Sequence, residues 1–355
     1  MKAAKTVAVA LAGILLASTA HAQVANLAYL GTYTQPTGLL LNGAEFGGIS
    51  GLDFDPATGL FYAISDDRAE RGPARFYTLR LTIDETGIHT LDIVSTVEIM
   101  GADGPFAAAG LDGESIRFDV ARGTLFWSSE RDADNVPGIF EVGTDGAFIG
   151  ALAVPAYYLP AGDTVGTYGN LAFEGLTLSA DGNMLFATTE NALAQDGLRA
   201  TLEGGSRSRL IAFDLATGAP TAEYVYLTDP IFTAATTEPA FNDNGISEIL
   251  AVGDSEFLVV ERSFASGVGN QISLYLATLD GATDILGAEI APADAVPMEK
   301  SLLLTIAEGD FGVDVDNIES VTFGPEIGGK RTLIIASDNN FSAAQFTQFV
   351  AFTFE

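Results

Sequence analysis

One pattern recurs five times along this chain of 355 residues: an alternating strand, a tight turn, and a second strand ending on an acid. The clearest copy begins at Glu174, turns through residues 180–183 and ends at Glu190. Alternating apolar and polar residues on both sides of such a turn predict a β-hairpin. The copies open at Ser50, Glu114, Glu174, Ser247 and Glu319 and close at Asp66, Glu130, Glu190, Glu261 and Asp338.

The spacing of these hairpins predicts how they assemble. Their openings lie 60 to 73 residues apart, which leaves room for four short strands and their loops. In three copies the closing acid follows the opening residue by 16 positions, whereas in the fourth and fifth copies it follows by 14 and 19 positions. A regular repeat of all-β units is typical of a radial array. We therefore expect an all-β fold, a β-propeller of four-stranded blades, with five or six blades.

The two ends of the chain predict how the ring closes. Residues 26–34 alternate like a strand but have no hairpin partner, and the fifth repeat stops one strand short before residues 345–355. We expect these two segments to pair, which makes residues 23–355 one domain. The outermost strand of the fourth repeat has two candidates, residues 288–290 and residues 302–306.

Residues 1–22 have the pattern of a secretory signal. Lys2 and Lys5 precede an apolar run over residues 7–16, and small residues follow up to Ala22. That run is too short to cross a bilayer, whose hydrocarbon core is about 30 Å thick. No later stretch is long and apolar enough either, so we expect an exported protein, periplasmic or extracellular, that is not inserted in a membrane.

Composition excludes several classes of function. The chain has 47 acidic against 16 basic residues, a formal charge of −31, which repels nucleic acids and anionic lipids. Cysteine is absent, and His89 is the one histidine after residue 22, so neither thiol catalysis nor a Ser-His-acid triad is available. No glycine-rich phosphate-binding loop is present, and we expect no organic cofactor. Hydrolysis would need metal-activated water or a carboxylate base.

Hairpin geometry predicts where the polar residues gather. The first strand runs away from its opening residue and the second returns, so openings and closings meet at one face of the ring. The residues expected there for catalysis are Glu114, Glu174, Glu319, Arg131 and Arg262, and those expected to bind metal are Asp66, Asp67, Glu130, Glu190, Glu261 and Asp338. Clustered carboxylates repel one another unless a cation neutralises them, and hard oxygen ligands suit Ca²⁺. The alternative is that these acids only hydrogen-bond backbone groups between blades.

Several of these segments resemble a known family. Residues 47–56 (Gly-Gly-Ile-Ser-Gly-Leu-Asp-Phe-Asp-Pro) and 61–68 resemble the phytase-like family of secreted bacterial proteins described by "esterase-like activity of phytase". Residues 111–116, 170–176 and 316–321 are similar to the recurring Glu-Gly/Ser-Ile/Leu sites of that family. The resemblance implies a propeller with hydrolase activity on phosphate or carboxylic esters and with Ca²⁺ as its candidate cofactor.

Three functions remain open from the sequence. The first is a metal-dependent hydrolase of small-molecule esters or phosphoesters that acts at the acidic face, with Arg131 and Arg262 stabilising an anionic substrate. The second is a non-catalytic binding propeller with structural calcium, and the third is a lactonase-like propeller. All three place acids on the same face. We expect the protein to act as a monomer.

Overall fold

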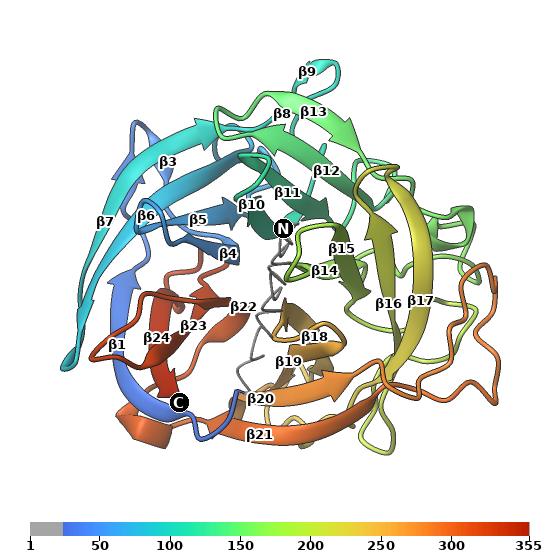
Figure 1. The fold of residues 1–355 in the computed structure, drawn as a ribbon. Helices are drawn as coiled ribbons and strands as arrows, with labels where there is room; N and C mark the ends of the chain where they lie inside the picture. Colours follow the sequence, from blue (N-terminus) through green and yellow to red (C-terminus); the bar gives the residue numbers. More distant parts are fainter. Residues whose placement is uncertain (1–23, 355) are drawn as a thin grey trace, which may run out of the picture.

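Five four-stranded antiparallel sheets are arranged as blades around one axis in the computed structural model, which describes residues 24–354 (Figure 1). Blade 1 contains β4 (Ile49–Asp55), β5 (Leu60–Ser65), β6 (Arg75–Asp84) and β7 (Gly87–Glu98). Blade 2 contains β10 (Gly113–Asp119), β11 (Thr124–Ser129), β12 (Gly138–Gly143) and β13 (Phe148–Ala151). Blade 3 contains β14 (Phe173–Leu178), β15 (Met184–Thr189), β16 (Arg207–Asp214) and β17 (Ala219–Leu227). The expected all-β propeller is confirmed.

The remaining strands complete the ring. Blade 4 contains β18 (Asn242–Ala251), β19 (Glu256–Ala265), β20 (Gly269–Thr278) and β21 (Glu299–Ala307). Blade 5 contains β22 (Asn317–Phe323), β23 (Arg331–Asp338), β24 (Phe346–Phe354) and, outermost, β1 (Ala28–Pro36). Short ribbons are formed by β2 (Leu40–Leu41) with β3 (Ala44–Glu45) and by β8 (Met100–Gly101) with β9 (Gly104–Pro105), and two 3₁₀ turns cover Ala156–Tyr158 and Asp310–Gly312.

Closure of the ring follows the expectation from the chain ends. Strand β1 pairs antiparallel with β24, from Ala28 opposite Thr353 to Pro36 opposite Phe346 (Figure 1). The fourth blade uses the later of its two candidate outer strands, because β21 spans Glu299–Ala307. The number of blades is five. Residues 1–22, where a secretory signal is expected, lie outside the described part of the chain.

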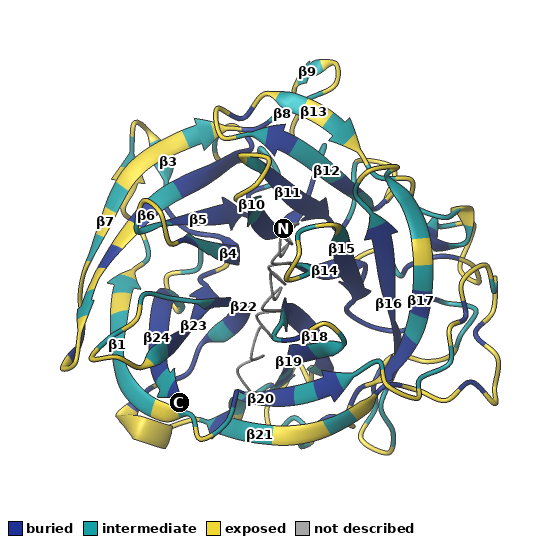
Figure 2. Ribbon diagram, in the orientation of Figure 1, coloured by how far each residue is buried: buried dark blue, intermediate teal, exposed yellow. Residues whose placement is uncertain are grey.

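The hydrophobic core lies between the blades. Five clusters of buried side chains each join two neighbouring sheets, as where Ile64 and Phe76 of blade 1 pack with Ile116 and Trp127 of blade 2. Inner and middle strands are mostly buried, whereas the outermost strands expose alternate residues (Figure 2). Each blade therefore depends on both neighbours for its burial, which explains why the ring must close.

All five innermost strands carry a β-bulge at the same place. The pairing with the second strand skips one residue in blades 1, 3, 4 and 5, and blade 2 sets two residues, Glu114 and Ser115, against one. A bulge re-aims side chains and commonly occurs next to functional sites. The residues at the bulges are Ser50, Glu114, Glu174, Ser247 and Glu319, the same five that open the sequence repeats.

An arginine closes the axis of the ring below these bulges. Arg117 of β10 is 2% exposed, and its guanidinium donates hydrogen bonds to backbone carbonyls on the innermost strands of all four other blades. The acceptors are the carbonyl oxygens of Leu52, Leu176, Ile249 and Val321, at 2.6–3.2 Å. The Glu248 carboxylate, fully buried on β18, lies 2.9 Å from Arg117 Nη2 and accepts a 2.7 Å hydrogen bond from Ser115 Oγ.

Close approach of the inner strands requires glycine at one position beside this arginine. A Cβ on Gly51 of β4 would lie 2.6 Å from the Ile116 backbone nitrogen and 2.7 Å from Ser115 Cα. Backbone atoms there cannot move without separating blades 1 and 2. Gly51→Ala should lower the free energy of unfolding by about 1–3 kcal/mol, the usual cost of overpacking, as measured by urea denaturation.

Gly150→Ala is the matched control for this prediction. Gly150 lies on β13, its φ is not in the left-handed region, and an added Cβ would meet nothing within 4 Å. A Gly51→Ala variant as stable as Gly150→Ala would show that the contact between β4 and β10 is not tight.

Candidate functional site

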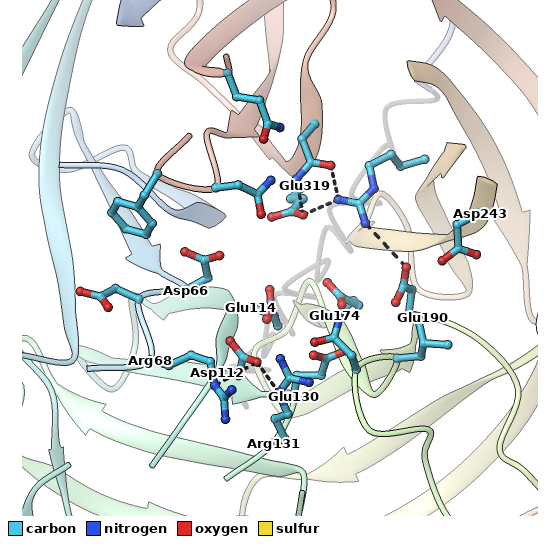
Figure 3. A pocket seen from close by; sticks show the side chains of 18 of the residues that line it. Asp66, Arg68, Asp112, Glu114, Glu130, Arg131, Glu174, Glu190, Asp243 and Glu319 are labelled. Carbon is cyan, nitrogen blue, oxygen red and sulfur yellow. Dashed lines mark hydrogen bonds and ion pairs between the residues drawn. The ribbon is translucent and has the colours of Figure 1, made fainter. Parts of the chain in front are cut away.

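A cavity of about 670 Å³ opens on the axis at the end of the ring where the innermost strands begin (Figure 3). The bulges place Glu114, Glu174 and Glu319 in its wall, and the segments just after the second strands add Asp66, Glu130 and Glu190. Ten acidic residues and four arginines line it: Asp66, Asp67, Glu70, Asp112, Glu114, Glu130, Glu174, Glu190, Asp243 and Glu319, with Arg68, Arg71, Arg131 and Arg262. The repeated acidic positions thus gather largely as the hairpin geometry predicts.

Two overlapping groups of carboxylates lie in the part of the cavity built by blades 2 and 3. Asp112, Glu114 and Glu130 each offer an oxygen within 4.8 Å of the others, and so do Glu130, Glu174 and Glu190. All five are buried, and Glu130 is shared by both groups. Glu130 also accepts a 3.0 Å hydrogen bond from the backbone N–H of Ala172, which orients it.

Burial and mutual repulsion raise the pKa values of these carboxyls. Burial, reinforced by Asp112, raises the pKa of Glu130 to about 7, and burial raises that of Asp112 to about 6 against the opposing effect of Arg131 and Arg68. Burial, with the nearby carboxylates adding to it, raises the pKa values of Glu114 and Glu174 well above their usual range. A site that holds protons this strongly at neutral pH is one that a cation would stabilise in its ionised form.

Asp66 stands at the opposite wall of the cavity from Glu190 (Figure 3). Burial, together with Glu319, Asp112 and Asp67, raises the pKa of Asp66 to about 8. Its Oδ1 atom is buried without a hydrogen-bond partner among the described residues. The side chain therefore carries a proton at neutral pH in the absence of a bound cation.

Three of the four cavity arginines are paired with these acids. Arg131 Nε lies 2.7 Å from Asp112 Oδ2, and Arg68 Nε lies 3.5 Å from the same oxygen. Arg262 binds Glu319 through Nη1 and lies 3.6 Å from Glu190 Oε1 through Nη2 (Figure 3). Glu319 is fixed further by Ser50 Oγ, which donates to its Oε2 at 2.9 Å.

The structure places Glu261 outside this cavity. In blade 4, Glu261 pairs with Ile246, as Ser65 pairs with Ile49 in blade 1, so the residue equivalent to the closing acid Asp66 is Arg262. Because side chains alternate along a strand, a shift of one residue sends Glu261 to the other face. The observed strand pairing therefore corrects the expected closing residue of the fourth repeat, which is Arg262 and not Glu261.

Glu261 instead belongs to a separate network between blades 3 and 4. Its Oε1 lies 2.5 Å from Lys300 Nζ and accepts a 2.8 Å hydrogen bond from the Tyr226 hydroxyl. The Lys300 ammonium lies 4.2 Å from the ring centroid of Tyr275 and 2.8 Å from Asp229 Oδ1. With its charge neutralised by Lys300, Glu261 is left out of the metal site proposed below.

Two other expected ligands have their oxygens engaged: Asp67, which lines the cavity, and Asp338, which is not among the lining residues. Asp67 is buried and binds Arg75 Nη1 at 2.5 Å, while its other oxygen accepts backbone N–H groups of residues 70 and 71. Asp338 is 1% exposed and accepts hydrogen bonds from the Asn340 backbone and the Asn317 side chain. Both support the wall and are less available to a ligand than Glu130 or Glu174.

Sequence reasoning missed Asp112 and Asp243 as cavity residues. Asp112 lies two positions before the opening Glu114, where the other blades have Gly48, Ala172, Gly245 and Asn317. That position could have been found by comparing the residues that precede each opening. Asp243 stands in the polar run of residues 242–245, which in the sequence is equally consistent with a solvated loop, and it comes into the cavity through the extra length of β18.

Fold and site together define a class of protein, a five-bladed β-propeller with a carboxylate-lined cavity on its axis. A sequence model of the Phytase-like family, described as "Esterase-like activity of phytase", matches residues 44–341. This match spans most of the 355 residues, and the chain belongs to that family.

Comparisons with individual proteins add the following findings. A solved Dos1 propeller is similar at 9% sequence identity and a TM-score of 0.33, covering 86% of this chain and 68% of that one. An endo-arabinase from Bacteroides thetaiotaomicron is similar at 12% identity and a TM-score of 0.47, covering 91% and 97%. No curated protein matches the chain. Within residues 24–354, no helix has the length and hydropathy that crossing a bilayer would require.

Proposed function

We propose that the protein is an exported hydrolase of small-molecule phosphate or carboxylic esters that uses Ca²⁺ held in the axial cavity. The observation that supports this proposal is the pair of overlapping carboxylate groups that share Glu130, in a member of the Phytase-like family. Neighbouring buried carboxyls destabilise a fold unless they hold protons or a cation. Bulges in three blades turn a glutamate into the cavity (Glu114, Glu174 and Glu319), and this gathering of acids is best explained by use of the site.

The donor set fits a hard divalent cation. Asp112, Glu114 and Glu130 would hold it on one side, or Glu130 with Glu174 and Glu190 on the other, since Ca²⁺ takes six to eight oxygen ligands, of which carboxylates supply a part. When bound, the cation supplies a Lewis acid that polarises a carbonyl or phosphoryl oxygen. Because these carboxyls hold protons at neutral pH, they would release them on binding, so affinity should rise with pH.

Residues of the chain itself would bind and orient the substrate. The guanidinium of Arg262, clamped by Glu319 and close to Glu190, is placed to donate hydrogen bonds to an anionic oxygen in the cavity. Arg131 has the same capacity next to Asp112. The Arg117–Glu248 pair lies buried among the innermost strands, outside the cavity lining, so substrate and product would exchange through the open end of the cavity.

The test measures calcium binding and turnover separately. We expect calorimetry to detect Ca²⁺ binding with proton release, and hydrolysis of p-nitrophenyl phosphate or p-nitrophenyl acetate to stop in chelator. Glu130→Gln should weaken calcium binding and lower kcat by about 100-fold or more, as loss of an acid-base or metal-positioning carboxylate does. Glu203→Gln, an exposed acid outside the cavity, is the matched control.

A binding propeller with structural calcium is the second candidate, favoured by the depth at which the carboxylates lie. It predicts that Ca²⁺ binds and raises the melting temperature while neither ester is turned over with any divalent ion. Such a result would remove the hydrolase proposal. A lactonase-like activity would appear instead as turnover of lactones alone.

A further inference from the structure

One cavity arginine is not paired with a carboxylate. Arg68 and Arg131 share Asp112, and Arg262 binds Glu319. The Arg71 guanidinium makes no hydrogen bond or ion pair with any residue in the described part of the chain, although it lines the same cavity. It is exposed to solvent, so its charge and its planar set of donors are available to a ligand.

An aromatic ring holds this guanidinium in place. Arg71 Cζ lies 4.6 Å from the ring centroid of Phe341, which also lines the cavity. Phe341 and Asn340 both have left-handed backbone, with φ of 50° and 47°. For a bulky residue such as phenylalanine this conformation is strained, and strain of this kind persists where the surroundings hold it and clusters at ligand sites.

The surroundings of Phe341 explain why its strained conformation persists. Asn339 Oδ1 accepts the backbone N–H of Phe341 at 3.2 Å and that of Gly48 at 2.9 Å. A Cβ on Gly48, whose φ is +66°, would lie 2.8 Å from the Phe341 ring, so only glycine lets the ring settle there. Blades 1 and 5 thus cooperate to build an aromatic support for one arginine.

The backbone of Arg71 is also fixed. Asp67 Oδ1 accepts its N–H at 3.0 Å, and the other oxygen of Asp67 is held by the buried Arg75 at 2.5 Å. The side chain is therefore anchored at both ends, by a hydrogen bond at its backbone and by ring stacking at its guanidinium. Less entropy is lost when a pre-positioned arginine binds an anion.

We propose that Arg71, stacked on Phe341, is the docking group for an anionic moiety of the substrate, so that the site selects phosphate-bearing over neutral esters. This inference rests on the proposed hydrolase function. Arg71 follows Asp66 in blade 1, and Asp66 lies across the cavity from Glu190 (Figure 3). The phosphate would lie between Arg71 on that wall and the carboxylate groups of blades 2 and 3, which would hold the calcium, and a guanidinium binds phosphate in bidentate fashion.

The test compares Arg71→Met with Arg71→Lys and with Arg80→Met, an exposed arginine on β6 outside the cavity. For calcium-loaded protein, Arg71→Met should raise KM for p-nitrophenyl phosphate about 10- to 100-fold, the loss expected for a charge-assisted hydrogen-bonded pair. Values of kcat, and KM for neutral p-nitrophenyl acetate, should stay unchanged. Arg71→Lys should restore part of the affinity, and Arg80→Met should match wild type.

Binding of inorganic phosphate, measured by calorimetry, keeps this test independent of turnover. We expect wild-type protein to bind phosphate and Arg71→Met to bind it at least about tenfold more weakly. Equal phosphate affinity in the two proteins, or no binding by wild type, would overturn the role of Arg71. An equal rise in KM for both esters would do so as well, since it would indicate a general disturbance of the cavity. If neither ester is hydrolysed, the proposed function fails and phosphate binding alone decides the role of Arg71.

Discussion

Arg117→Met is expected to lower the free energy of unfolding by about 3–5 kcal/mol, because it breaks a buried ion pair and leaves one partner uncompensated. The guanidinium donates hydrogen bonds to carbonyls from four blades, and it is only 2% exposed, so solvent has little access to replace it. Glu248, fully buried, would lose its charged partner at 2.9 Å. Chemical denaturation of purified protein, at one pH and calcium concentration, measures the effect.

Arg80→Met removes the same charge from an exposed site and should change stability by no more than about 0.5 kcal/mol. In a double variant, Arg117→Met with Glu248→Leu, part of the lost stability should return, because no unpaired carboxylate remains on the axis. If Arg117→Met and Arg80→Met unfold at the same denaturant concentration, the arginine does not hold the blades together. In that case the double variant would show no recovery of the free energy of unfolding.

The hairpins could be predicted because their information is local. Alternation of apolar residues and a turn such as residues 180–183 specify a strand pair without reference to the rest of the chain. The end segments could be matched because an unpaired strand and an incomplete repeat complement each other. Blade number followed from counting repeats once the β1–β24 pairing showed that no sixth unit is needed.

The axial residues depend on contacts between distant blades and left no comparable signal. Arg117 reads in the sequence as one polar residue in an alternating strand, and its four acceptors lie 59 to 204 positions away. The bulges also leave no recognisable pattern in the sequence, because a bulge is defined by the pairing of two strands. Glu261 and Arg262 show the consequence, since a difference of one residue in register exchanges an acid for an arginine in the cavity wall.

The acidic cavity should make the stability of the calcium-free protein fall as pH rises from about 4 to about 8. Folding raises the pKa of Asp112 to about 6, of Glu130 to about 7 and of Asp66 to about 8. Between their unfolded and folded values the native state holds more protons than the unfolded state, so the free energy of unfolding decreases with pH. Each unit of raised pKa corresponds to about 1.4 kcal/mol, so the summed loss should reach several kcal/mol. Carboxyls with lowered pKa, such as Asp181, are already ionised in this window.

Calcium should reverse this loss at the alkaline end, where the carboxylates are ionised and bind it most tightly. At a calcium concentration 100 times the dissociation constant, the native state gains about 2.7 kcal/mol. We expect thermal unfolding in chelator to show a lower melting temperature at pH 8 than at pH 5, with calcium raising it strongly at pH 8 and little at pH 5. Glu130→Gln, which removes the carboxylate shared by both groups, should flatten the pH dependence and reduce the calcium effect together. A melting temperature in chelator that stays constant or rises from pH 5 to pH 8 would mean that these carboxyls are not strained by their burial, and the reason for a cation at the axis would be lost.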